Sequence, residues 1–528
     1  MAKRAPLLLL LLAVAVVAAR GGDAPPAFDL VVRNGRVLDG SGAPWRRADV
    51  GVRDDRIVAI GRLDHASARE EIDAAGRYVV PGFIDAHSHA YPALSRPGTA
   101  AAEALLRQGI TTVLINPDGG GPVDLAAQRR TIESVVPGVN VVQLIGHNAV
   151  RGAVLGSADR APDDAELARM AALVRRGFEA GAFGLSAGPF YTPGAFSKTE
   201  EHIALARVAA EFDGFYTSHI RDEADYTIGV VAAVEEVIRV AQEARLPGIV
   251  THIKVLGPRV WGLSGEIIKR IDAARAAGVE LYADQYPYEA SSTGLTAALV
   301  PSWALAGGVG KLQGRLANAE LRARIRREMI DNLARRAGPA NIMIRSFKAE
   351  PALEGRRLDA IARERLLEPV DAALDLIQRG GASIVSFNMD ERDLRAFMVQ
   401  PWTMTSSDGE LVAFGEGVPH PRSYGPYPRK LRRYVFDEAL LPLERAIHSM
   451  SGLPAAVFRI RDRGTLRAGA FADLAVFDPA AVRDRATYEQ PHQYAEGVTD
   501  VVVNGRVALR SGRLLAGRAG RVLIRERP

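Results

Sequence analysis

The central part of the chain repeatedly alternates short apolar runs with amphipathic stretches, and this alternation limits the folds available to it. Apolar residues in the amphipathic stretches recur at helical spacing, as at 167–178 and 228–238. Strands that alternate with helices pair in parallel, and this many units favours a closed barrel over an open doubly wound sheet. No GxGxxG motif follows the first strand, so dinucleotide binding is unsupported. The runs that predict buried strands are 111–115, 139–145, 183–186, 215–219, 248–252 and 279–284.

The two ends of the chain carry similar segments, VVRNGRV at 31–37 and VVVNGRV at 501–507. Each is a β-branched run broken by Asn-Gly, which is a strong hairpin signal. They could be two unrelated hairpins, but we expect both ends to form one small β domain, from 23–80 and 456–528. The barrel then spans 81–455. An insertion at about 295–375, with an Arg-rich helical stretch at 316–336, interrupts the alternation of strands and helices. It is interpreted as a lid over the barrel mouth.

The first residues are typical of a secretory signal peptide. Lys3 and Arg4 precede an apolar run at 6–19, and VAA at 17–19 resembles a cleavage site. The run is shorter than the roughly 20 residues of a membrane span, so cleavage of residues 1–22 is favoured over an uncleaved anchor. No later apolar run is long enough to span. We therefore expect an exported protein, periplasmic or secreted, without a stable membrane span after cleavage.

The chain contains no cysteine. An exported protein of this length must then rely on its core rather than on disulfides, and any transition-metal site must use histidine and carboxylate ligands. The net charge of +5 is small and scattered, without a basic stripe. Nucleic-acid binding is therefore not expected.

The strongest local motif is PGFIDAHSH at 81–89, an apolar strand that ends in His-x-His. Alternate side chains of a strand point the same way, so His87 and His89 face the same side. At the carboxyl end of a barrel strand, they would point into the active-site mouth and suit a divalent metal.

Further candidate ligands end other predicted strands. His219 closes GFYTSHIR and His252 closes GIVTHIK, on successive strands. Asp408 ends the run before Gly409; it could bind a metal and carry a proton, or simply form an Asp-Gly turn. Asp118 ends TTVLINPD before three glycines and could be a turn residue, a further ligand or a bridge. His147, in LIGHN, is a weaker candidate for the same site.

From about residue 28 to its end, the chain resembles the N-acyl-D-amino-acid deacylase (D-aminoacylase) branch of the amidohydrolase superfamily. The segments that carry this resemblance are PGFIDAHSH at 81–89, GITTV at 109–113, GAFGLSAGPFYTPG at 181–194, YTSHIRDEAD at 216–225, THIKVLG at 251–257, YPYEASST at 286–293, SSDG at 406–409, HPRSYG at 420–425, RDRGTLRAGAFADLAVFDP at 461–479 and PHQY at 491–494.

The resemblance implies a distorted (β/α)8 barrel with a small β domain from both termini, and one or two divalent ions of the zinc type. It places His87, His89 and Asp408 on a metal, with Asp408 also the general base, and His219 and His252 on the tightly held metal. Four further residues match positions that hold the substrate carboxylate or polarise its scissile carbonyl: Lys254, Tyr286, Ser292 and Arg422. Chemistry agrees for Arg422 and Lys254, since an acylated amino acid is an anion.

One position departs from the family. Asp118 stands where these proteins usually carry a metal-binding cysteine, in Pro-Asp-Gly instead of Asn-Cys-Gly. Aspartate is a harder ligand than thiolate and can bridge two ions.

The function expected from the sequence is metal-dependent hydrolysis of N-acyl-D-amino acids to a carboxylate and a free D-amino acid. The small-molecule partner is then an acylated amino acid or a short peptide. One alternative keeps the mechanism but acts as a dipeptidase on peptides with a C-terminal D-residue. Another class of alternative is a non-catalytic exported binding protein on a hydrolase scaffold, for which Asp118 is the only support.

The N-terminal motif predicts that the mature protein begins near Arg20 and is found outside the cytoplasm, because the apolar run follows two cationic residues and ends in small ones. Mass spectrometry of native material, separated by compartment, would measure the mature terminus. An intact Met1 on the bulk of the protein would contradict the prediction.

Overall fold

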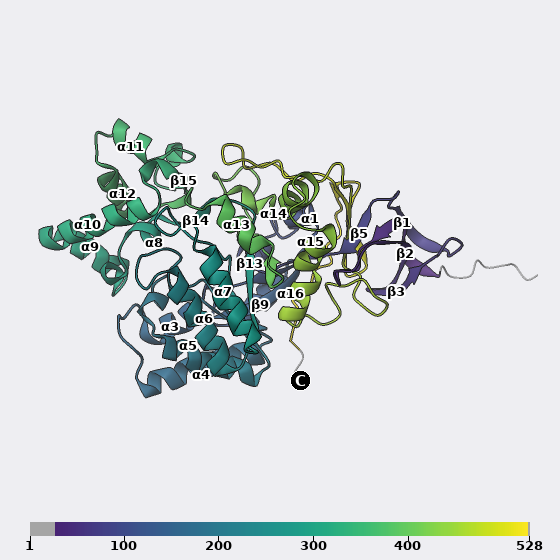
Figure 1. The fold of residues 1–528 in the computed structure, drawn as a ribbon, viewed down its shortest axis with the longest axis horizontal. Coiled ribbons are helices and arrows are strands. Elements are labelled where there is room, and N and C mark those ends of the chain that lie inside the picture. The colour runs from purple at the N-terminus through teal and green to yellow at the C-terminus, as the bar shows by residue number, and fades with distance from the viewer. Residues whose placement is uncertain (1–26, 526–528) are drawn as a thin grey trace, which may run out of the picture.

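The computed structural model describes residues 27–525, and at its centre lies a nearly closed barrel of parallel strands (Figure 1). The signal peptide predicted at 1–22 falls outside the described residues. Each strand pairs in parallel with its neighbours in space, in the order β17-β13-β12-β11-β10-β9-β8-β6. The strands are β6 (Phe83–Asp85), β8 (Ile110–Ile115), β9 (Asn140–Gly146), β10 (Gly184–Ala187), β11 (Phe215–Ser218), β12 (Gly248–Val250), β13 (Leu281–Gln285) and β17 (Thr403–Thr405).

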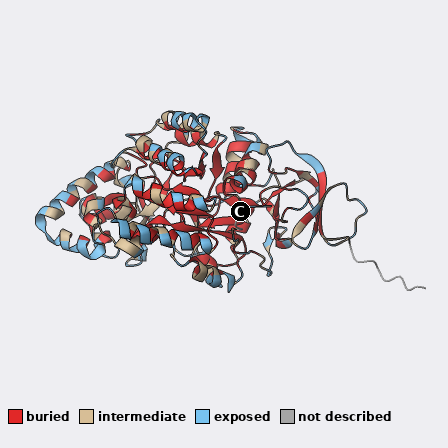
Figure 2. Cartoon of the chain, turned by 90° about the horizontal axis from the view of Figure 1, so that it is seen from below, coloured by how far each residue is buried: buried red, intermediate tan, exposed pale blue. Residues whose placement is uncertain are grey.

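The predicted fold class is confirmed, and each of the six predicted strand segments overlaps a barrel strand. These strands are apolar because helices cover the outside of the barrel and side chains fill its inside, which leaves almost no strand residue exposed. Figure 2 shows this core in red, with the exposed faces on the surrounding helices. The covering helices include α2 (Leu125–Glu133), α3 (His147–Leu155), α4 (Asp164–Glu179), α5 (Thr199–Glu211), α6 (Val230–Ala244), α7 (Ser264–Ala276) and α13 (Glu391–Met398).

The helical spacing at 167–178 is confirmed by α4, whose start Asp163 and Glu166 close with a capping box. The spacing that begins at Ile228 is confirmed from Val230 onward. Ile228 itself precedes α6 and is 48% exposed, so it is not part of the buried face.

The first and last barrel strands meet through short extensions at their carboxyl ends. β7 (Ser88–His89) continues β6, and β18 (Gly409–Glu410) continues β17; the two extensions pair in parallel, with His89 opposite Glu410. The Asp408 N–H also donates to the His87 carbonyl at 2.9 Å. The barrel is therefore joined at the position of the predicted metal ligands.

Between β13 and β17 the chain leaves the barrel and forms a separate layer, seen at the upper left of Figure 1. A three-stranded antiparallel sheet, in the order β14-β16-β15, packs with helices around its own apolar core. Its elements are β14 (Ser291–Gly294), α8 (Leu295–Leu299), α9 (Val309–Ala317), α10 (Ala319–Arg335), β15 (Ile342–Ser346), α11 (Leu358–Glu364), α12 (Pro369–Gln378) and β16 (Ser383–Ser386). Among the described residues, no helix combines the length and apolar character needed to cross a membrane.

Strands that precede the barrel and strands that follow it join in one sheet, as expected, at the right of Figure 1. Its order is β22-β21-β20-β19-β5-β1-β2-β3, and β4 pairs with β1. The antiparallel contact of β5 with β19 connects the two ends. The strands are β1 (Phe28–Val37), β2 (Arg46–Arg53), β3 (Arg56–Gly61), β4 (Ala68–Asp73), β5 (Tyr78–Pro81), β19 (Leu474–Phe477), β20 (Val498–Val503), β21 (Arg506–Arg510) and β22 (Arg513–Leu514).

The two Asn-Gly pairs differ in structure. Asn504 and Gly505 both have positive φ and form the predicted hairpin between β20 and β21. The hairpin predicted at Asn34-Gly35 is wrong: β1 runs through it, with a bulge at that point. Asn34 takes a φ of 56° and its N–H donates to Asp49 Oδ1, while a Cβ on Gly35 would lie 2.5 Å from Val79. Close packing against β5 explains the glycine there.

A buried polar group joins the β domain to the barrel. The Asp473 carboxylate pairs with the Arg463 guanidinium and accepts from the Asn504 N–H at 2.7 Å and from Asn140 Nδ2, at the start of β9, at 3.0 Å. Both charged side chains are 3% exposed. Because the pair is shielded from water, loss of the Asp473 carboxylate would leave the Arg463 charge buried without a partner at the junction of the two domains.

We predict that Asp473→Ala lowers the free energy of unfolding by about 3–5 kcal/mol, since it strands the buried charge of Arg463. The matched control is Asp64→Ala, which removes an exposed carboxylate paired with Arg62 and should change stability by less than about 1 kcal/mol. Urea denaturation followed by circular dichroism measures both. Equal small shifts for the two variants would contradict the role given to Asp473.

Candidate metal centre and active site

The six side chains predicted as metal ligands lie together at the carboxyl ends of the barrel strands. They come from five separate segments, which only closure of the barrel brings into contact. A cavity of about 370 Å³ opens above them, between the barrel loops and the inserted layer. The six are His87, His89, Asp118, His219, His252 and Asp408.

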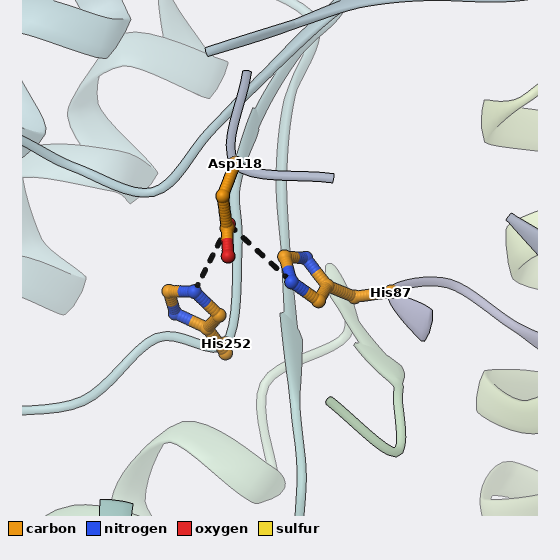
Figure 3. Close-up of side chains that lie close together, drawn as sticks. All are labelled: His87, Asp118 and His252. Carbon is orange, nitrogen blue, oxygen red and sulfur yellow. Dashed lines mark ion pairs between the residues drawn. The ribbon is translucent and has the colours of Figure 1, made fainter. Parts of the chain in front are cut away.

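Asp118 lies at the centre of the group. Its Oδ1 is 3.4 Å from His87 Nε2 and 3.5 Å from His252 Nε2, the two contacts drawn in Figure 3. The same oxygen is 3.8 Å from His219 Nδ1, and Oδ2 is 3.4 Å from His89 Nε2. One carboxylate therefore contacts all four imidazoles, which is the arrangement a bridging ligand requires.

The remaining contacts divide the group into two halves. On one side, Asp408 Oδ1 lies 3.1 Å from His89 Nε2 and 3.6 Å from His87 Nε2. On the other, His219 Nδ1 and His252 Nε2 are 2.9 Å apart. Each half offers two imidazole nitrogens and shares Asp118.

The electrostatics of the group couple acids to bases. Burial by itself would raise the pKa of the Asp408 carboxyl, but Arg422 and the histidines hold it well below its usual range. Burial likewise opposes the charged form of Asp118, yet His87 and its neighbours hold its pKa well below normal. Burial would lower the pKa of His89, but Asp118 and Asp408 outweigh it and raise that pKa to about 10. Burial lowers the pKa of His219 to about 4.

The residues present fit one or two divalent ions. The described residues contain three sets of acidic and histidine side chains whose ligand atoms lie within 4.8 Å of one another: His87 with Asp118 and His252, His87 with His89 and Asp408, and His219 with Glu223 and His252. His87 Nε2, His219 Nε2 and Asp118 Oδ1 are buried without a hydrogen-bond partner. Buried polar atoms are costly unless they are satisfied, and a metal ion would satisfy these atoms.

The loop that carries Asp118 is anchored to its neighbours on the barrel rim. The Gly119 N–H donates to Ser186 Oγ, and that hydroxyl donates to the Asn116 carbonyl at 2.6 Å. Gly119 has a φ of 73°, and a Cβ there would lie 2.3 Å from Asn148. Three site residues also have left-handed backbone: Asp118 (φ 56°), His252 (φ 35°) and Asp408 (φ 48°). Such conformations cost energy and occur where the surrounding structure holds them in place.

A residue that the sequence analysis missed is Glu223, in the loop after β11. Its carboxylate lies 2.6 Å from Lys254 Nζ and 3.2 Å from His252 Nδ1, and Oε2 lies 3.6 Å from His219 Nε2. Burial opposes its ionisation, but Lys254 and the histidines keep its pKa low. The sequence offered one signal for it: an acidic residue four positions after a histidine that ends a strand. The loops at this face of a barrel carry its functional groups, so an acid in that loop was a candidate.

Three more buried residues position predicted site residues and were also missed. Asp85 accepts from the Ser407 N–H at 2.7 Å and from the Ser407 hydroxyl, beside Asp408. Asp284 Oδ1 accepts from the His252 N–H at 2.9 Å. His420 Nδ1 accepts from the Arg422 N–H at 3.0 Å.

The predicted substrate-binding residues lie beside the predicted metal ligands. Lys254, Ser292 and Arg422 line the cavity. Arg422 Nη1 is 2.7 Å from Asp408 Oδ2, and Lys254 Nζ donates to the His252 carbonyl. Tyr286 is buried beneath both cations, with Arg422 4.8 Å and Lys254 5.6 Å from its ring centre.

Other histidines do not join the group. His147 Nε2 lies 2.8 Å from Glu201, which also pairs with Arg151 in a separate buried cluster. His202 bonds Ser197 Oγ and Tyr216, and His448 bonds the Gly40 carbonyl.

Comparison with known proteins extends these observations. Residues 70–509 match the model of the Amidohydrolase family. The chain is 37% identical to the D-aminoacylase of Alcaligenes xylosoxydans xylosoxydans, over 95% of this chain and 99% of that protein.

Two solved structures are also similar. One is the N-acyl-D-glutamate deacylase of Bordetella bronchiseptica, complexed with zinc and a phosphonate inhibitor that mimics the tetrahedral intermediate. Its TM-score is 0.82 at 35% sequence identity, and the match covers 94% of this chain and all of that one. The other is a D-aminoacylase with a binuclear metal centre, in which one metal activates and the second metal attenuates. Its TM-score is 0.81 at 35% sequence identity, with the same coverage of both chains.

The position of Asp118 predicts that Asp118→Ala weakens divalent-metal binding by more than about 100-fold, beyond the loss typical of residues that only support ligands. The reason is that its carboxylate contacts both halves of the group. Asp124→Ala, an exposed helix cap six residues away, is the control and should keep its metal. Metal content by mass spectrometry and competition with a chelator measure the effect, and unchanged stoichiometry and affinity would exclude Asp118 as a ligand.

Proposed function

The chain belongs to the amidohydrolase family, in its D-aminoacylase branch, and on this basis we propose that it hydrolyses the amide bond of N-acyl-D-amino acids with a divalent metal. The observation that carries the proposal is the contact of Asp118 with four histidines, next to the Asp408–Arg422 pair. It combines a place for metal, a proton carrier and a cation for the substrate carboxylate. The alternative of a non-catalytic binding protein loses its support, because Asp118 lies among the ligands rather than disrupting them.

The chain's own residues would divide the metal-binding work as follows. His87, His89 and Asp408 would hold one ion, His219 and His252 the other, and Asp118 would connect them. Zinc suits this set, because imidazole and carboxylate are its ligands in the absence of cysteine. When bound, the metal lowers the pKa of a water molecule and polarises the scissile carbonyl. A proton on His89, favoured by its raised pKa, must leave for that nitrogen to bind metal.

Asp408 is the proton carrier in the proposed mechanism. Its depressed pKa keeps the carboxylate ionised, so Asp408 accepts a proton as the water oxygen adds to the carbonyl carbon. It then returns this proton to the amide nitrogen as the C–N bond breaks. The products are a carboxylate and a free amine. The backbone bond from Asp408 to His87 keeps the carboxylate beside the reacting atoms.

Arg422 would hold the substrate carboxylate. It is 6% exposed and faces the cavity, and a planar guanidinium can bind a carboxylate through two N–H groups. Lys254 would help to polarise the carbonyl, and Glu223 fixes its position through the 2.6 Å pair.

The direct test is turnover by the metal-loaded protein on matched D and L N-acetyl amino acids, and on dipeptides with a C-terminal D-residue. We expect hydrolysis of the D compounds, loss of activity with a chelator and recovery with Zn²⁺. Equal hydrolysis of both enantiomers would contradict the stereochemistry, and preferred cleavage of the dipeptides would identify a dipeptidase instead.

We predict that Asp408→Asn lowers kcat by about 10²- to 10⁴-fold, the usual contribution of a positioned acid–base group, while bound metal falls only partly. The amide keeps the size of the side chain but cannot accept the proton. Steady-state kinetics and metal analysis on the same preparation measure the two effects. A variant with near-normal kcat would remove Asp408 from the mechanism.

We predict that Arg422→Ala raises KM for N-acetyl-D-amino acids by about 10- to 100-fold, the value of a charged hydrogen bond, but not for their amidated analogues. Arg422→Lys keeps the positive charge but loses the two-pronged guanidinium, so its KM should lie between those of the wild type and of Arg422→Ala. Kinetics on both substrate types measure the effect. Equal losses on both would mean that Arg422 acts through Asp408, with which it pairs.

A further inference from the structure

A second, larger cavity of about 840 Å³ lies beside the metal centre, between the loop after β10 and the helices of the inserted layer. Its walls include Phe190, Tyr191 and Gly294, which also line the first cavity. The two spaces are therefore neighbours. The Tyr191 ring is 4.6 Å from the His219 ring, and its hydroxyl is 3.2 Å from Thr293 Oγ1.

The two cavities differ in chemistry. The first is lined by the acids, histidines and cations of the site. The second has one apolar wall, formed by Ala297, Ala298, Val300, Trp303, Leu305 and Val309, while charged and hydroxyl side chains line its other sides. Val309 is 70% exposed at the start of α9, so the cavity reaches solvent there.

The charged groups around the second cavity do not require a charged ligand. Arg221 lies 2.7 Å from Glu236, and Arg335 lies 3.1 Å from Asp225. Glu328 accepts from Trp303 Nε1 at 2.9 Å and from Arg324. These three side chains already have partners, and Asp331, the fourth charged residue of the lining, is exposed to solvent on α10. The shielded part of the space therefore suits an apolar occupant.

The direction of the substrate follows from the contacts of the metal centre. Arg422 pairs with Asp408 at one end of the group, Tyr191 packs on His219 at the other, and Asp118 lies between. A substrate whose carboxylate is held by Arg422 and whose amide lies at Asp118 extends its acyl group toward Tyr191. The second cavity lies beyond that ring.

We infer that the second cavity is an acyl-chain subsite, and that the enzyme acts on D-amino acids carrying a medium or long fatty acyl group. This inference rests on the proposed function. A 370 Å³ cavity holds the amino acid and the reacting amide, and an acetyl group leaves the adjoining apolar space unfilled. Tyr191 lines both spaces and therefore lies at the boundary between them.

The test compares two substrate series that add the same number of methylenes at different ends. One lengthens the acyl group on D-alanine from acetyl to octanoyl; the other keeps acetyl and lengthens the D side chain. We expect kcat/KM to rise about fourfold per methylene in the acyl series until the cavity is full, as burial of a methylene predicts. A rise in the side-chain series instead, or no rise in either, would overturn the assignment.

Ala297→Phe should cut the octanoyl-to-acetyl ratio of kcat/KM by about tenfold or more, because it fills the cavity from α8. The control is Ala306→Phe, which adds the same ring in the same segment at a half-buried position outside the cavity lining; it should keep the wild-type ratio. Equal ratios for the two variants would overturn the subsite.

A binding measurement separates this inference from the proposed function. Calorimetry with octanoate and acetate on the metal-loaded protein should give octanoate at least about 100-fold tighter affinity, weakened by Ala297→Phe and not by Ala306→Phe. If no amide is hydrolysed but this preference holds, the proposed function fails while the apolar subsite stands. If octanoate has no preference, the subsite is wrong even where acetyl substrates are hydrolysed.

Discussion

Closure of the barrel at β6 and β17 is the constraint on which the site depends, and the site residues themselves provide it. Asp85 receives the N–H and hydroxyl of Ser407, and the Asp408 N–H donates to the His87 carbonyl. Asp85 is fully buried at this seam, and burial raises the pKa of its carboxyl to about 7 despite these bonds. The histidine pair and the carboxylate proposed as proton carrier are therefore held in register by the same hydrogen bonds that complete the fold.

The side chains of the candidate metal centre are also arranged so that opposite charges lie next to each other. Four imidazoles surround one carboxylate, and each cation of the site has an acid beside it: Lys254 has Glu223 and Arg422 has Asp408. Paired charges can be buried where single ones cannot. Such an arrangement explains how a site with so many ionisable groups exists at the end of an apolar barrel. Aspartate at position 118 also suits its loop, because aspartate adopts left-handed backbone more readily than most residues.

Patterns along the chain were sufficient to predict the barrel and the joining of both ends in one sheet. They made the six side chains that meet at the mouth candidates, and the family resemblance was needed to assign them to a metal. Each of those side chains ends or follows an apolar run that predicts a strand. The carboxyl ends of parallel barrel strands all lie at one face, so residues at these positions are expected to meet there. Glu223, Asp85 and Asp284 were missed because their importance lies in contacts with other strands, which local sequence does not encode. The Asn34-Gly35 hairpin was wrong for a related reason: the same dipeptide makes a turn or a bulge, and the neighbouring β5, with Val79 against Gly35, determines which.

The β domain has a consequence for the order of assembly. Among the described strands, β1 to β5 leave the ribosome before those of the barrel, but β5 pairs with β19, which is made only after the barrel. Until then one edge of the N-terminal sheet has no partner, and an unpaired edge can associate with other chains. Contacts so distant in sequence form slowly, because a long loop must close before they are made. A nascent chain of this protein therefore carries an open strand edge through nearly all of its synthesis, and it would gain from a chaperone that covers that edge until the last strands arrive.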